Sequence, residues 1–261
     1  MLALAIIVGL FLAGVVRPPA VLEGDLADAR GDRPGLRVLF VGNSLTYFND
    51  MPQLVQRLAA AAPAGGPIFT VEYARAGQTL EGHDGDGRLR ALLREARWDD
   101  VVLQEQSYRG SAPAEARMRD TDPYAASLGR AIRRAGARPV LFATWGFQEG
   151  DPDDVPGDDY AAMQQRVLEN YAMLGAELRA PVVPVGAAWE RALSLRPTIG
   201  LWAWDGGHPS PRGSYLAACV FYGALTGRNP ERSAFTAGLP PSDAHFLQRV
   251  AADVTGVASR G

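Results

Sequence analysis

A serine, an aspartate and a histidine in this chain have the types and spacing needed for acyl transfer. Ser44 follows four consecutive apolar residues at 38–41 and a Gly-Asn pair. That pattern indicates a buried strand of a parallel sheet ending in a sharp turn. Ligands of open α/β sheets bind beyond the carboxyl ends of the strands, so the Ser44 hydroxyl is a candidate nucleophile. A serine is equally suited to cap the following helix, so its partners must decide between the two interpretations.

A serine nucleophile needs a base, and the chain has three histidines, His83, His208 and His245. His208 ends the spacing Asp205-x-x-His208, which lies beyond the last expected strand and just before an expected helix. On a turn, this spacing lets the Asp205 carboxylate orient the imidazole in one cleft. The alternative is a turn stabilised by Asp205, with His208 capping the next helix. We expect His83 in a solvated loop and His245 on a C-terminal helix.

Other chemistry is disfavoured by the remaining reactive residues. The single cysteine, Cys219, excludes an internal disulfide, and its apolar helical surroundings predict a buried, inert thiol. A calcium loop counted from Asp84 fails because its fifth and sixth positions are Arg88 and Leu89. We therefore expect neither a metal nor an organic cofactor.

The elements that must position these residues alternate between strands and helices. Strands are expected at 38–41, 68–73, 100–106, 139–144 and 181–185, and helices at 51–62, 88–97, 123–136, 158–179 and 211–225. This alternation implies right-handed crossovers and a five-stranded parallel sheet covered by helices on both faces, an α/β/α sandwich.

Composition and the N-terminal segment bear on partners and location. The formal net charge is −3 and no run is rich in Lys or Arg, which argues against a nucleic-acid partner. Residues 1–16 carry no charged side chain, which is typical of a signal peptide or a short membrane anchor. We expect an exported protein, periplasmic or extracellular, that contacts a membrane through this segment alone. Residues 17–35 are expected to be a linker and 36–261 a single catalytic domain.

Four blocks, in the order of the family and each behind its own predicted strand, carry a resemblance to the SGNH (GDSL) hydrolases; the first, second and fourth are described here. Gly-Asn-Ser-Leu-Thr at 42–46 resembles the nucleophile block, with Asn43 in place of the aspartate of the family name. Ala-Arg-Ala-Gly at 74–77 resembles the block whose glycine N–H helps to bind the oxyanion. Asp-Gly-Gly-His-Pro at 205–209 resembles the block that supplies the acid and base. The resemblance implies a flavodoxin-like fold and a triad of Ser44, Asp205 and His208.

The third block departs from the family pattern. Where the family has Gly-x-Asn-Asp, this chain has Gln-Glu-Gln-Ser at 104–107. The resemblance implies that the oxyanion is bound by the N–H groups of Ser44 and Gly77 and by one glutamine amide. We favour Gln106, with Gln104 as the alternative, because both side chains would point the same way on an extended strand and Gln106 is nearer its carboxyl end.

The resemblance implies a serine ester hydrolase that acts through an acyl-serine intermediate. Aromatic residues expected around the cleft suit a sugar ring, so we expect a carbohydrate or small-ester substrate, with deacetylation as the first hypothesis. These aromatic residues are Tyr47, Phe48, Tyr108, Trp145, Trp202 and Trp204. Two alternatives stay open, an O-acyltransferase using the same site and an exported carbohydrate-binding protein that has lost turnover.

Overall fold

The strand that leads to Ser44 is β1 (Leu36–Gly42), which lies inside the sheet between β2 and β3. The computed structural model describes residues 23–63 and 66–257, so the predicted signal or anchor segment at 1–16 lies outside the described residues. Within these ranges no helix is long and apolar enough to span a bilayer. The five strands are all parallel and lie in the order β2-β1-β3-β4-β5. The remaining strands are β2 (Ile68–Ala74), β3 (Asp100–Leu103), β4 (Arg138–Ala143) and β5 (Val182–Pro184).

The strand order creates a crevice at the carboxyl end of β1. The chain leaves β1 toward β2 on one side and then crosses to β3 on the other side, and such a reversal opens a ligand crevice in α/β sheets. The register runs from Leu36 opposite Ile68 to Gly42 opposite Ala74, so β1 and β2 end together. The segments that follow β1, β2 and β3 therefore meet at one edge of the sheet.

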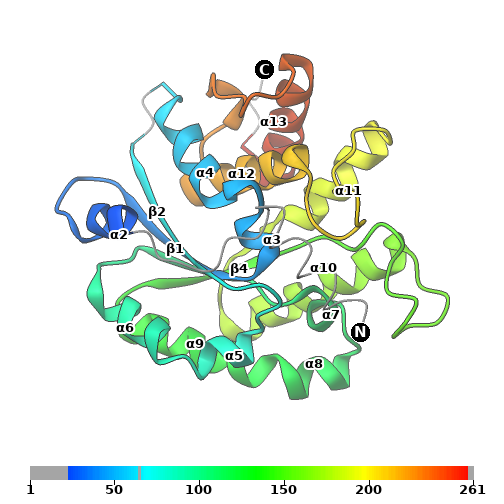
Figure 1. Ribbon diagram of the computed structural model, residues 1–261, viewed down its shortest axis with the longest axis horizontal. Helices are drawn as coiled ribbons and strands as arrows, with labels where there is room; N and C mark the ends of the chain where they lie inside the picture. The colour runs from blue at the N-terminus through cyan, green and yellow to red at the C-terminus, as the bar shows by residue number, and fades with distance from the viewer. Residues whose placement is uncertain (1–22, 64–65, 258–261) are drawn as a thin grey trace.

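Two helical layers cover the sheet, as Figure 1 shows. One face packs against α4 (Met51–Ala60), α11 (Val185–Leu195), α12 (Pro211–Thr226) and α13 (Pro241–Thr255). The other face packs against α2 (Glu23–Arg30), α5 (Leu80–Asp84), α6 (Gly87–Glu95), α9 (Asp122–Arg134) and α10 (Tyr160–Leu178). Short helices α3 (Ser44–Tyr47), α7 (Ser107–Gly110) and α8 (Ala114–Asp120) connect these elements.

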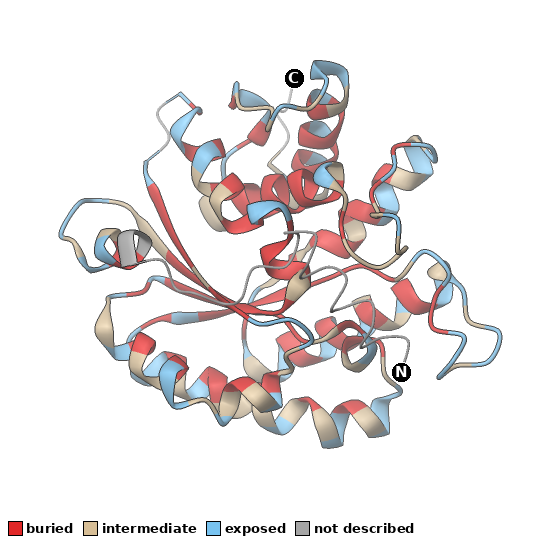
Figure 2. Cartoon of the chain, in the orientation of Figure 1, coloured by how far each residue is buried: buried red, intermediate tan, exposed pale blue. Residues whose placement is uncertain are grey.

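Both faces of β1 are buried, which explains its unbroken apolar run. Val38 and Phe40 enter the core beneath α4 and α12, whereas Leu39 and Val41 enter the core on the opposite face. Figure 2 shows the buried residues concentrated along the strands and along the inner sides of the helices. The predicted three-layer α/β/α sandwich with a parallel five-stranded sheet is confirmed.

Part of the segment predicted as a linker is folded. Within 17–35, residues Glu23–Arg30 form α2, and the side chains of Leu26 and Ala29 are 0% and 1% exposed. The linker prediction is therefore wrong for this part. The sequence shows no clear helical pattern there, because Leu26 and Ala29, which pack in the core, stand among charged and small residues.

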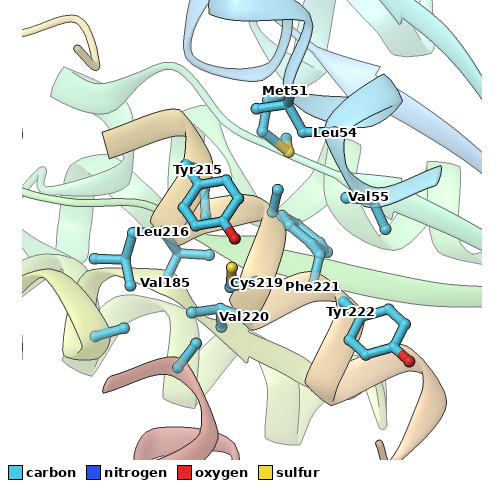
Figure 3. Packing of buried hydrophobic residues seen from close by; sticks show 14 of the residues in the cluster. Met51, Leu54, Val55, Val185, Tyr215, Leu216, Cys219, Val220, Phe221 and Tyr222 are labelled. Carbon is cyan, nitrogen blue, oxygen red and sulfur yellow. The ribbon is translucent and has the colours of Figure 1, made fainter. Parts of the chain in front are cut away.

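Cys219 lies in the core, as predicted. It sits on α12 among Tyr215, Val220 and Phe221, in the packing that Figure 3 shows from close by. Burial raises the pKa of its thiol, so the thiolate that would react or bind a metal is disfavoured.

Candidate active site

The turn after β1 leaves the Ser44 hydroxyl available for chemistry. Asn43, not Ser44, is the N-cap of α3, because the Asn43 Oδ1 atom accepts a hydrogen bond from the Leu45 N–H at 3.1 Å. Ser44 occupies the first helical position. A side chain at Gly42 would collide with Thr46 and Gln104, so the tight turn requires glycine there.

The structure brings Ser44, His208 and Asp205 together in a hydrogen-bonded chain. Ser44 Oγ lies 2.8 Å from His208 Nε2, and His208 Nδ1 lies 2.5 Å from Asp205 Oδ2. These are the distances at which an imidazole can take a proton from a hydroxyl while a carboxylate holds the other ring nitrogen. The arrangement supplies a nucleophile, a base and an orienting acid from two distant parts of the chain.

Asp205 both orients the ring and shapes the loop around it. Its Oδ1 atom accepts the N–H groups of Gly207 at 3.0 Å and His208 at 2.9 Å. Burial raises the pKa of Asp205, but the hydrogen bond from His208 and these backbone donors outweigh it and hold the pKa at about 2. Asp205 is therefore a carboxylate at neutral pH.

Aromatic side chains fix the imidazole and its loop. The Phe48 ring stacks on the His208 ring with centroids 4.2 Å apart and planes inclined by 14°. On the other side of the loop, the Trp145 indole N–H donates to the Gly207 carbonyl oxygen at 3.0 Å. These contacts restrict the ring to the orientation that faces Ser44.

The backbone N–H groups of Ser44 and Gly77 have no acceptor among the described residues. Gly77 lies in a turn in which the Gln78 N–H donates to the Arg75 oxygen at 3.1 Å, and its φ of +66° favours glycine. The Asn43 Nδ2 atom donates to the Gln78 carbonyl oxygen at 3.0 Å. This bond ties the Gly77 turn directly to the nucleophile turn.

Gln104 is committed to the interior and is not available to an oxyanion. Its side chain is 0% exposed, and its Oε1 atom accepts the Asn43 N–H at 2.8 Å and the Thr46 hydroxyl at 2.9 Å. Its Nε2 atom donates to the carbonyl oxygen of Glu105 at 2.5 Å. Gln104 thus shapes the nucleophile turn, and the alternative that placed it in the oxyanion site is wrong.

Gln106 has the opposite arrangement. The predicted strand over 100–106 ends at Leu103, so Gln104 and Gln106 do not share the common direction expected of them. The Gln106 Oε1 atom caps α7 by accepting the N–H groups of Tyr108 at 2.8 Å and Arg109 at 3.3 Å. Its Nε2 atom has no acceptor among the described residues. The oxygen fixes the amide and leaves its nitrogen as a donor.

Two polar residues near the site were not recognised from the sequence. His83, expected in a solvated loop, is fully buried on α5, and its Nε2 atom donates to the Gly42 carbonyl oxygen at 2.8 Å. Burial lowers the pKa of His83, which keeps the ring neutral. Glu105 is also fully buried. Its only signal in the sequence was its place between two glutamines at a strand end.

Of the six aromatic residues expected around the cleft, Tyr108 and Trp204 expose much of their surface, 46% and 77%. Tyr47, Phe48 and Trp145 are buried, and Trp202 is partly buried. Across residues 23–63 and 66–257, no group of three or more His, Cys, Asp or Glu side chains is arranged to hold a metal ion.

Comparison with solved structures places this architecture among known enzymes. A protein from Slackia heliotrinireducens assigned to the SGNH hydrolases is 31% identical in sequence, with a TM-score of 0.61, over 74% of this chain and 100% of that chain. A DUF4886 family protein from Bacteroides uniformis is 18% identical, with a TM-score of 0.71, over 85% of this chain and 95% of that chain.

A third similar structure is Axe2, an acetylxylan esterase from Geobacillus stearothermophilus. It is 17% identical, with a TM-score of 0.52, over 74% of this chain and 94% of that chain. At this identity the likeness concerns the fold alone. No family model matches the chain, and no curated protein matches its sequence.

Proposed function

The chain belongs to the SGNH hydrolase family of carboxylic ester hydrolases, and from that premise we propose that Ser44, His208 and Asp205 form its catalytic triad. The observation that carries the proposal is the hydrogen-bonded chain from Ser44 Oγ through both ring nitrogens of His208 to Asp205. A helix cap or a stabilised turn alone would not need His208 Nε2 to face Ser44.

In the acylation step, His208 Nε2 takes the Ser44 hydroxyl proton as Oγ attacks the ester carbonyl carbon. The Asp205 carboxylate stabilises the imidazolium that forms. Collapse of the tetrahedral intermediate breaks the bond to the leaving alcohol, which receives the proton from His208. Water then attacks the acyl-serine, with His208 again acting as base, and the acid and free Ser44 are released.

The negative oxygen of the intermediate is held by the Ser44 N–H, the Gly77 N–H and the Gln106 amide in this proposal. Support comes from the absence of any acceptor for these donors among the described residues and from the bonds that fix each of them. A single oxyanion donor is typically worth about 3 kcal/mol of activation free energy. Hydrogen bonds from three donors to the negative oxygen therefore account for a large part of the expected rate enhancement.

We further propose that the substrate is an acetylated carbohydrate or a comparable small ester. Trp204 directly precedes Asp205, and Tyr108 lies on α7, which Gln106 caps, so two exposed aromatic side chains belong to the segments that carry the site. Exposed aromatic faces suit sugar rings because they offer a flat apolar surface on which a ring can stack. The esterase Axe2 of the same fold acts on acetylxylan according to its name.

Export, to the periplasm or the extracellular space, remains part of the proposal and depends on the apolar segment at 1–16. The O-acyltransferase and the non-catalytic binding protein are not favoured, because the triad geometry is complete and no feature of the described residues selects an acceptor alcohol over water.

The test is a screen of aryl acetates, acetylated xylo-oligosaccharides and long-chain esters with the full chain. We expect a burst of phenol from the aryl acetate and turnover of an acetylated sugar, both absent in Ser44→Ala. Equal rates in the wild type and Ser44→Ala would refute the triad. Release of acid only when a second alcohol is withheld would instead indicate an acyltransferase, and binding of sugars without turnover would indicate the binding protein.

A further inference from the structure

Glu105 is a buried carboxylic acid that the proposed mechanism does not use. It lies two residues beyond the end of β3, between Gln104 and Gln106, and its side chain has no exposure to solvent. Burial of a carboxylate is costly unless its oxygens receive hydrogen bonds, so its contacts should explain its presence.

Those contacts join the two segments that carry oxyanion donors. Glu105 Oε1 accepts the Gln106 N–H at 2.6 Å and the Leu80 N–H at 3.2 Å. Its Oε2 atom accepts the Thr121 hydroxyl at 3.3 Å, and its own N–H donates to the Tyr171 hydroxyl at 3.1 Å. The backbone of Glu105 is therefore anchored to α10 and its carboxylate to the N-cap residue of α9, while one carboxylate oxygen bridges two loops.

The bridged loops are the ones on which oxyanion binding depends. Leu80 begins α5, three residues after Gly77, and the other partner is Gln106 itself. We propose that Glu105 is a positioning residue, whose carboxylate keeps the Gly77 turn and the Gln106 amide at the spacing that the oxyanion requires. This inference rests on the proposed function. A displacement of about 1 Å in such a site can cost about a hundredfold in rate.

The charge of Glu105 should affect how firmly it holds these loops. Burial raises the pKa of Glu105 to about 7, although the N–H groups of Gln106 and Leu80 favour the ionised form. Arg109 is the positively charged group that faces it, and Arg109 also pairs with Glu81 at 2.9 Å. On α10, burial raises the pKa of Tyr171, so that phenol stays neutral. A carboxylate accepts hydrogen bonds about twice as strongly as a neutral acid, so protonation near neutral pH should loosen both loops.

The kinetic test compares Glu105→Ala and Glu105→Gln with a matched control, Asp100→Asn. Asp100 is a buried carboxylate at the opposite end of β3, where it pairs with Arg138. We expect kcat to fall about a hundredfold in Glu105→Ala and about tenfold in Glu105→Gln, with KM unchanged, because glutamine restores an acceptor oxygen without the charge. Asp100→Asn should leave kcat unchanged whatever its stability.

The pH profile supplies a readout that a purely structural role would not move. In the wild type, protonation of Glu105 with a midpoint near pH 7 should lower kcat/KM toward acid in a limited step of up to about tenfold, the loss expected for the uncharged Glu105→Gln. In Glu105→Gln this step should be absent. The same pH profile in both proteins, or kcat in Glu105→Gln equal to that of the wild type, would overturn the inference.

A substrate-free measurement separates this inference from the proposed function. The amide proton resonances of Leu80 and Gln106 should shift together with a midpoint near pH 7 in the wild type, and the shift should be lost in Glu105→Gln. Resonances that do not respond would refute the bridge even in an active esterase. An intact bridge in a wild type that hydrolyses no ester would refute the proposed function and with it the catalytic value of the bridge.

Discussion

Replacing Asp205 with asparagine separates its catalytic role from its structural one. The two oxygens of Asp205 have different partners, the backbone N–H groups of residues 207 and 208 on Oδ1 and the His208 ring on Oδ2. Asparagine keeps an oxygen for the backbone donors but presents an N–H₂ group to the ring. His208 must then place its proton on Nε2, where it cannot accept the Ser44 proton.

The expected magnitudes follow from this division. A pKa of about 2 against the usual 3.8 means that the folded protein favours the Asp205 carboxylate by about 2 kcal/mol. Asp205→Asn loses part of that stabilising free energy but keeps the bonds from the backbone N–H groups of residues 207 and 208. Its kcat should fall on the order of a thousandfold or more because the ring adopts the wrong tautomer. Asp205→Ala should lose the same activity. Its free energy of unfolding should also fall by about 1 to 3 kcal/mol, because the backbone donors are left without an acceptor.

The assay is aryl acetate hydrolysis at pH 7 together with urea unfolding of the wild type and both variants. We predict two inactive variants that differ in stability, with the asparagine variant closer in stability to the wild type. An Asp205→Asn protein with kcat within about tenfold of the wild type would refute it. Equal stability of the two variants would refute the structural half.

Three further predictions concern the loops around Ser44. Gln106→Ala should lower kcat about a hundredfold and the free energy of unfolding by about 1 kcal/mol. Gln106→Ser should restore the helix cap and the stability but not kcat. Steady-state kinetics and urea unfolding would measure the two effects. Asn43→Asp should keep the cap of α3 but lose the bond to the Gln78 carbonyl oxygen, lowering kcat about tenfold or more with a helix content unchanged by circular dichroism. Folding raises the pKa of Glu105 from 4.5 to about 7, so the folded state binds more protons than the unfolded state between those pH values. The free energy of unfolding should therefore fall by about 3 kcal/mol as pH rises through that range. Glu105→Gln should flatten this pH dependence.

Much of the fold was predictable because each buried strand is a local apolar run. β1, β2 and β4 were expected within one residue or two of their observed bounds, since most of their residues are apolar and buried, although Thr70 and Glu72 stand within β2. The positions of Ser44 and of the pair Asp205 and His208 followed from strand ends and a local spacing. Their contact depends on long-range bonds that hold the loop of His208, from Asn49 to the Pro209 oxygen and from Trp145 to the Gly207 oxygen.

The features that sequence reasoning missed depend on long-range contacts. Nothing local marks the end of β3 at Leu103, and that end decides that Gln104 turns inward while Gln106 caps a helix. Likewise, Asn43 gains its meaning from Gln78, which lies 35 positions away. An amide can accept from the α3 backbone and donate to the Gly77 turn at once, whereas the aspartate of the family name can only accept.

The central claim is that Ser44 forms a covalent acyl-enzyme. The most direct measurement is acid quenching of the full chain during turnover of an aryl acetate, followed by mass spectrometry of its peptides. We predict one acetyl group on the peptide that contains Ser44, and none in Ser44→Ala treated in the same way. Turnover without any acylated peptide, or an acetyl group on another residue that persists in Ser44→Ala, would contradict it.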